Sequence, residues 1–254
     1  MWNDVTDLRD FYASGLGQMA QRMICCAMRI VWPDVTGLRV MGLGFATPYL
    51  RLFKGKAERT LAFMPASQGV MPWPEDEPGL VALTDETALP LPDCSIDRLV
   101  VIHALESTEQ VRALMRELWR VLADGGRLMV VVPNRSGIWA RLERTPFGIG
   151  RPYTTAQLHF LLRDSLFTPV RKETSLFVPP SRSRMLFRSA PAWEKLGRRW
   201  FPTFAGVLVV EAVKQIYAAP LNRQMEREQR QARVAVPGGV PLDSADTPPG
   251  HPGG

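Results

Sequence analysis

The sequence predicts an α/β fold in which helices cover a mostly parallel β-sheet. Short apolar runs that are typical of buried strands alternate with segments whose apolar residues recur every three or four positions, as in amphipathic helices. Such alternation is typical of a parallel sheet with helices on its faces. The chain has 254 residues, 46% of them hydrophobic and 22% charged. That is enough for one domain with a sizeable core.

The first thirty residues are expected to form one amphipathic helix that packs on the core. Trp32 and Pro33 are expected to end it, because proline cannot continue a helix. The polar face of this helix carries few basic residues, which favours core packing over membrane anchoring. Its apolar residues recur at spacings near three and four: Phe11, Met19, Met23, Cys26 and Ile30.

Seven segments are expected to be strands. Arg98–Ile102 is apolar enough to be buried on both faces of the sheet. Val170–Val178 alternates only loosely, which is typical of an outer strand, and Val207–Val213 is expected to be the last strand. The other four are Leu38–Leu43, Arg59–Met64, Leu80–Thr84 and Leu128–Val132.

Local signals predict where three helices begin and where one ends. A hydroxyl side chain before proline is a helix start, and a hydroxyl followed three residues later by glutamine fits a capping box. Paired glycines favour a left-handed turn that ends a helix. The signals are Thr47–Pro48, the capping boxes Ser107 with Gln110 and Thr154 with Gln157, and the helix end Gly125–Gly126.

The chain is expected to divide into three parts. Residues 1–33 form the N-terminal helix, and residues 34–220 form the α/β domain. Within that domain, residues 179–202 lie between the last two strands and are expected to form a lid insertion. Residues 221–254 are polar and then rich in proline and glycine, so we expect them to be disordered.

Composition argues against several classes of protein. The sequence has no run of about 18 apolar residues, so a membrane span is not predicted. Acidic residues precede any apolar stretch at the amino terminus, which argues against a secretory signal. Cys25 and Cys26 are adjacent and Cys94 is alone, so neither a disulfide framework nor a metal site is expected. These features favour a cytoplasmic protein.

Three stretches, taken in order, resemble the class I family of S-adenosylmethionine-dependent methyltransferases. They are residues 42–48 (GLGFATP), 84–97 (TDETALPLPDCSID) and 116–128 (RELWRVLADGGRL), and the resemblance covers roughly residues 38–133. It implies a Rossmann-like three-layer sandwich with a mostly parallel seven-stranded sheet and one antiparallel strand. Val207–Val213 would supply the final hairpin partner. The ligand would sit outside the carboxyl ends of the strands.

The resemblance also implies the cofactor S-adenosylmethionine and a set of binding residues. Two carboxylates typical of the family are missing, because glycine replaces one in the first loop and none follows the second strand. Three simpler interpretations stay open: a plain strand-to-helix turn, a surface glutamine and a turn-forming aspartate. The residues implied are Gly42, Gly44 and Ala46 at the methionyl end, Gln68 at the ribose, and Asp85 with Glu86 at the adenine.

His103 is the candidate catalytic residue. It follows the fourth predicted strand, where folds of this kind place residues that face the methyl acceptor. Its ordinary pKa suits a general base near neutral pH. A packed, hydrogen-bonded histidine is the alternative, and Glu106 and Tyr153 are weaker candidates.

A basic region precedes the last predicted strand. Between Arg141 and Arg199 there are 12 Lys or Arg and four Asp or Glu. Within the predicted lid, Trp193, Leu196 and Trp200 share one helical face. A basic, aromatic lid would suit a hydrophobic or anionic acceptor, or docking at an anionic membrane surface. The alternative is a helix that packs its tryptophans into the core.

The leading functional hypothesis is a methyltransferase that acts on a small-molecule or lipid-like acceptor. The main alternative is a catalytically degenerate methyltransferase fold that serves as a binding or regulatory module. Nucleic acid is not expected as a partner, because only the net charge of +6 suggests it. The sequence leaves the acceptor and the oligomeric state open.

Overall fold

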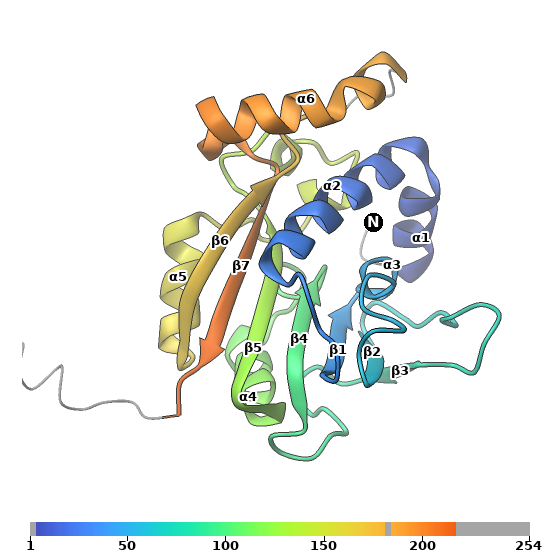
Figure 1. Ribbon diagram of the computed structural model, residues 1–254, viewed down its shortest axis with the longest axis vertical. Helices are drawn as coiled ribbons and strands as arrows, with labels where there is room; N and C mark the ends of the chain where they lie inside the picture. Colours follow the sequence, from blue (N-terminus) through green and yellow to red (C-terminus); the bar gives the residue numbers. More distant parts are fainter. Residues whose placement is uncertain (1–3, 181–183, 217–254) are drawn as a thin grey trace, which may run out of the picture. The chain divides into compact units, whose positions relative to one another are not determined.

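The computed structural model describes residues 4–180 and 184–216. The predicted disordered segment 221–254 lies outside these residues. Seven strands form one sheet in the order β3-β2-β1-β4-β5-β7-β6 (Figure 1). Its parallel part is made of β1 (Arg39–Gly44), β2 (Arg59–Pro65), β3 (Val81–Thr84), β4 (Ile96–Ile102) and β5 (Leu122–Pro133).

The last two strands complete the sheet. β7 (Val207–Lys214) runs antiparallel both to β5 and to β6 (Phe167–Ser175), so β7 is the single antiparallel strand. β6 lies at the edge, as its loose alternation predicts. The predicted Rossmann-like fold with one antiparallel strand is therefore confirmed.

Two apolar clusters, one on each face of the sheet, make the core. Alternate residues along β1 and β4 enter different clusters: Val40 and Val100 pack on one face, Met41 and Leu99 on the other. The first face is covered by α1 (Val5–Ala13), α2 (Gly15–Val31) and α3 (Thr47–Leu50). The second is covered by α4 (Val111–Val121) and α5 (Thr155–Asp164). This arrangement is the three-layer sandwich.

The N-terminal region forms two helices, so the prediction of a single helix was wrong. Ser14 has an extended backbone between them and caps α2 by accepting a hydrogen bond from the Gly17 amide at 3.1 Å. The predicted apolar stripe is correct at Phe11 and Met19, which are buried, and wrong at Cys26 and Ile30, which are exposed. The buried stripe of α2 consists of Met19, Ala20, Ile24, Ala27, Met28 and Val31.

Helix starts were predicted with mixed success. The capping box of Thr154 and Gln157 is confirmed at the start of α5. Ser107 and Gln110 do not form one, because α4 begins at Val111 without a side-chain cap. Ala46, and not Thr47, is the N-cap of α3, which also lacks a side-chain cap.

The predicted glycine end of α4 was wrong as well. The helix ends at Val121, and Leu122 already begins β5, so Gly125 and Gly126 lie within the opening of that strand. Gly125 does have the left-handed backbone expected of it, with φ of 73°. Tertiary pairing of Ile96 with Leu122 therefore starts the strand before the glycines.

The predicted insertion between the last two strands contains helix α6 (Arg184–Trp200) and a short 3₁₀ turn, η3 (Pro202–Phe204). In Figure 1, α6 lies across the end of the sheet toward which the parallel strands point. Among the helices of the described part of the chain, none is both long and apolar enough to cross a bilayer.

Candidate functional site

The loop after β1 is closely packed. Gly44 has φ of 86°, and a Cβ there would lie 2.2 Å from the carbonyl oxygen of Ile102, so only glycine fits between β1 and β4. At Gly42 a Cβ would lie 2.6 Å from the Cβ of Ala46 and 2.8 Å from Leu50. The missing family carboxylate therefore has no room at Gly42, because α3 packs directly on the strand.

Gln68 closes the space above this loop. It follows β2, and its side-chain amide donates a hydrogen bond to the backbone carbonyl of His103, which follows β4. Since β1 lies between β2 and β4 in the sheet, this bond crosses the carboxyl end of β1, where Gly44 stands. Gln68 is 5% exposed, so the prediction of a surface-loop glutamine was wrong.

Tyr12 from α1 closes the same space from the outside. Its ring stacks on Phe45, with centroids 5.6 Å apart and planes 14° from parallel. Its hydroxyl lies 2.7 Å from Nε2 of His103, and the Tyr49 hydroxyl donates to it at 2.7 Å. Nδ1 of His103 lies 3.2 Å from Oε1 of Glu106.

We call Tyr12, Tyr49, His103 and Glu106 the tyrosine–histidine cluster. All four side chains are buried. Burial raises the pKa of Tyr12 and of Tyr49 well above that of a free phenol, so both stay neutral. Because Tyr49 donates to Tyr12, the Tyr12 proton is free to bind Nε2 of His103. The pattern then assigns the histidine proton to Nδ1, which donates to Glu106.

One polar atom of this cluster lacks a partner within the described residues. Oε2 of Glu106 is buried and makes no hydrogen bond there. Phe147 packs beside His103, with ring centroids 5.0 Å apart, and helps to exclude water from the cluster. The sequence suggested Glu106 only as a weaker candidate.

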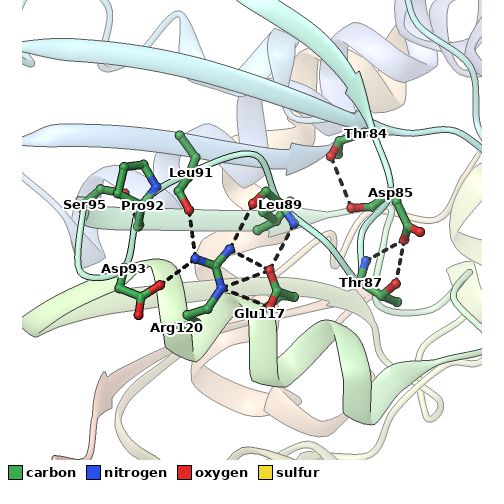
Figure 2. A network of polar contacts seen from close by, with 10 residues as sticks. All are labelled: Thr84, Asp85, Thr87, Leu89, Leu91, Pro92, Asp93, Ser95, Glu117 and Arg120. Atoms are coloured by element: carbon green, nitrogen blue, oxygen red, sulfur yellow. Dashed lines mark hydrogen bonds and ion pairs between the residues drawn. The ribbon is translucent and has the colours of Figure 1, made fainter.

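Asp85 and Glu86 lie in the loop after β3. Asp85 is exposed, and its Oδ1 accepts hydrogen bonds from the backbone amide and the hydroxyl of Thr87, at 2.8 and 2.7 Å (Figure 2). These bonds, that of the amide first, lower the pKa of the Asp85 carboxyl. Glu86 accepts a hydrogen bond from the Thr108 hydroxyl at 3.2 Å. Asp85 thus forms a turn, whatever else it binds.

Helix α4 fixes the rest of this loop. Arg120 donates to the carbonyls of Leu89 and Leu91 and to the carboxylate of Asp93, at 2.9, 2.8 and 2.7 Å (Figure 2). Glu117 pairs with Arg120 at 2.8 Å and accepts from the Leu89 amide at 3.0 Å. The second and third family-like stretches, residues 84–97 and 116–128, are therefore hydrogen-bonded to each other. The Leu89 side chain is buried in the core.

The structure brings His103, Gln68 and Gly44 together and places Asp85 on a separate, exposed turn. Sequence reasoning missed Tyr12 and Tyr49. The available signal was a tyrosine in each of the two segments that flank the glycine loop in the fold. Nothing in their spacing predicted contact, because Tyr12 lies 91 positions before His103.

A pocket of about 410 Å³ lies beside the closed loop, between the α1–α2 pair, α3 and the segment that follows β2. Arg9, Arg22 and Arg51 contribute three guanidinium groups to its lining, and Glu75 contributes one carboxylate. Its apolar part includes Phe45 and Trp73. A cavity of this size and charge is suited to a small anionic ligand.

Comparisons with known proteins agree with the fold. Residues 37–130 match a family described as "Methyltransferase domain". The chain is 28% identical over 156 residues to an uncharacterized protein of Mycobacterium tuberculosis, Rv2003c, and to its Mycobacterium bovis counterpart. The match covers 59% of this chain and 52% of those proteins, so the chain spans about half their length.

Solved structures show the same architecture. An S-adenosylmethionine-dependent methyltransferase of Thermotoga maritima superposes with a TM-score of 0.57 at 17% identity, covering 85% of this chain and 100% of that one. The [4+2]-cyclase SpnF gives 0.58 at 20% identity, covering 85% and 95%. A Burkholderia thailandensis N-methyltransferase with bound S-adenosylhomocysteine gives 0.51 at 16%, covering 77% and 78%. Likenesses at these identities show the fold alone.

Proposed function

We propose that this chain, whose residues 37–130 match a methyltransferase domain and whose fold is that of class I methyltransferases, is a catalytically degenerate member that acts as a binding or regulatory module. One observation carries this proposal. Gln68 and Tyr12 meet at His103 and together occupy the space above Gly44, where members of the family hold the methionyl end of their cofactor.

The residues present do not fit S-adenosylmethionine at two of its three parts. At the methionyl end, a carboxylate at Gly42 is excluded by Ala46 and Leu50. At the ribose end, the buried Gln68 donates its amide NH2 to the His103 carbonyl and keeps only one uncharged oxygen where the family has a carboxylate. Only the adenine end keeps a fitting group, the exposed carboxylate of Asp85. We therefore derive no chemical step through this cofactor.

The histidine is also unsuited to act as a general base in this arrangement. Its Nε2 lone pair is engaged by Tyr12, whose raised pKa keeps the phenol protonated. A base must reach the proton that it removes. His103 is buried at 3% exposure and faces Tyr12 and Glu106 instead of an open cleft.

Calorimetry tests this proposal. We expect no heat of binding when S-adenosylmethionine or S-adenosylhomocysteine is titrated to millimolar concentration into the full chain. Binding that disappears in Asp85→Ala, and persists in the control Asp93→Ala on the same loop, would contradict the proposal.

The pocket beside α1 and α2 is where we expect such a module to hold a small ligand. Its three arginines favour an anionic group, and Phe45 and Trp73 favour an aromatic one. Phenyl phosphate is a suitable probe, since it combines both. We expect it to raise the unfolding temperature, and Arg51→Glu to abolish this effect, while Arg112→Glu on α4 leaves it intact.

A second candidate function is a methyltransferase for a small-molecule or lipid-like acceptor. The observation in its favour is the buried Glu106–His103 pair at the carboxyl end of β4, together with the unpartnered Oε2 of Glu106. This function requires α1 to move away from the loop after β1. Methylation by the wild-type chain, lost in His103→Ala, would establish it.

A cytoplasmic location is compatible with either function, because Cys25, Cys26 and Cys94 are free thiols.

A further inference from the structure

Helix α6 and the turn η3 expose an unusual number of large apolar side chains. Five of them lie within one short segment and are between 39% and 64% exposed. Large apolar residues gathered on a surface mark an interaction site more often than isolated ones do. We call this set the α6 face: Trp193, Leu196, Trp200, Phe201 and Phe204.

The opposite side of α6 is fixed to the domain, which determines what faces outward. Glu194 is buried and accepts a hydrogen bond from the Phe177 amide at 2.9 Å. A Cβ on Gly197 would lie 2.3 Å from the Phe177 ring, so the helix closely approaches the segment that follows β6. With 3.6 residues per turn, Leu196 lies roughly opposite Glu194, and Leu196 and Trp200 are 51% and 64% exposed. Trp193 lies one turn before Gly197, nearer the packed side, and is 39% exposed. The expectation that these tryptophans pack into the core was wrong.

Positive charge borders the α6 face. Lys195 and Arg199 are exposed, and Arg198 is half-buried, 3.8 Å from the carboxylate of Glu194. Glu194 is the one acidic residue between positions 184 and 206, and it is buried. The outer surface of α6 is therefore apolar and cationic, without a compensating carboxylate.

We propose that the α6 face docks on the surface of an anionic lipid bilayer. Tryptophan and phenylalanine side chains insert at the boundary between headgroups and acyl chains, and neighbouring lysine and arginine bind anionic headgroups. A protein partner with an acidic groove would need a matching shape, whereas a bilayer accepts an exposed helix without one. Docking would turn the end of the sheet that carries α6 toward the membrane (Figure 1).

The chain's own C-terminal segment is a less suitable occupant. Residues 217–254 lie outside the part of the chain that the structure describes, so no contact with α6 is assigned to them. That segment is also balanced in charge, with four Arg, two Glu and two Asp from Leu221 onward. It thus offers the cationic helix no particular complement.

Vesicle co-sedimentation of the full chain tests the proposal. We expect binding to vesicles of phosphatidylcholine with about 30% phosphatidylglycerol. Binding to pure phosphatidylcholine should be much weaker, because the anionic headgroups supply the electrostatic attraction. The double variant Lys195→Glu/Arg199→Glu should raise the apparent dissociation constant at least about tenfold. Trp200→Ala/Phe201→Ala should weaken binding by a comparable factor.

Matched controls come from other exposed helices. Arg112→Glu/Arg116→Glu reverses two exposed charges on α4, and Phe160→Ala removes an aromatic side chain that is 73% exposed on α5. Both should bind like the wild-type chain. The proposal is overturned if the full chain does not bind anionic vesicles. It is likewise overturned if the charge reversal on α4 weakens binding as much as the charge reversal on α6. It is also overturned if light scattering shows a dimer that Trp200→Ala/Phe201→Ala disrupts while vesicle binding is absent.

Discussion

The side-chain amide of Gln68 donates a hydrogen bond to the backbone carbonyl of His103, and this bond passes over the end of the strand that lies between them. It holds together the loops that follow β2 and β4. His103 has φ of 55°, a left-handed conformation that costs a non-glycine residue about 1–3 kcal/mol, so neighbouring contacts must stabilise it.

Gln68→Ala should therefore destabilise the protein. The buried carbonyl of His103 would lose this donor, and such losses cost about 1–3 kcal/mol. Urea unfolding measures the change in the free energy of unfolding. Gln18→Ala is the control, because Gln18 also donates to a backbone carbonyl, that of Ala13, but at an exposed site. Equal losses of unfolding free energy in the two variants would show that the hydrogen bond of Gln68 does not stabilise the loops after β2 and β4.

Tyr12→Phe tests the tyrosine–histidine cluster. The variant keeps the ring on Phe45 and removes the hydroxyl between Tyr49 and His103. Two buried polar groups would each lose a partner, so we expect a loss of about 2 kcal/mol in the free energy of unfolding. Tyr153→Phe, at a half-buried phenol outside the cluster, should change it by less than about 0.5 kcal/mol.

Much of the fold was predictable because buried strands appear in the sequence as short apolar runs. All seven predicted strands exist, and the single antiparallel strand follows from the family resemblance. The errors lie where local signals compete with tertiary contacts. Ser107 and Gln110 have capping-box spacing, which would start the helix at Thr108, yet α4 starts three residues later, at Val111. Gly125 has a left-handed backbone, yet β5 is already paired at Leu122.

The site was less predictable than the fold. The missing carboxylates at the ends of β1 and β2 were visible in the sequence, but what fills their place was not. Tyr12 reaches His103 because α1 folds back over the sheet, and that depends on the break at Ser14 that a single-helix interpretation overlooked. The pairing of Glu117 and Arg120 with the loop after β3 likewise needs the packing of α4, not its sequence alone.

Arg120→Ala should loosen the loop between β3 and β4. The guanidinium group donates to two backbone carbonyls and to two carboxylates, and charged hydrogen bonds contribute about 1.5–3 kcal/mol each when well shielded. Here the side chain is 30% exposed, so we expect a total loss near the lower end of that range, about 1.5 kcal/mol. Hydrogen exchange should rise in residues 85–95. Arg116→Ala, at an exposed position on the same helix, should change neither quantity.

Acid should weaken the same contact through Glu117. Its hydrogen bond with Arg120 holds the pKa of the Glu117 carboxyl below the ordinary value of 4.5. A lowered pKa in the folded state adds stability that is present above pH 4.5 and is lost as the pH falls through the folded value. Unfolding free energies measured from pH 6 downward should therefore fall less steeply in Glu117→Gln than in the wild-type chain. Parallel curves would contradict the assignment.

Adjacent cysteines on α2 should differ in reactivity. Cys26 is exposed, whereas burial raises the pKa of the Cys25 thiol to about 12. Only the thiolate reacts with iodoacetamide, and at pH 8.5 a thiol with so high a pKa is almost wholly protonated. Peptide mass spectrometry should show Cys26 alkylated at least about tenfold faster than Cys25. Raising the pH to 10 should speed the reaction of Cys25, because its thiolate fraction rises about tenfold per pH unit below its pKa. Equal rates at pH 8.5 would mean that α2 does not bury Cys25 against the domain in solution.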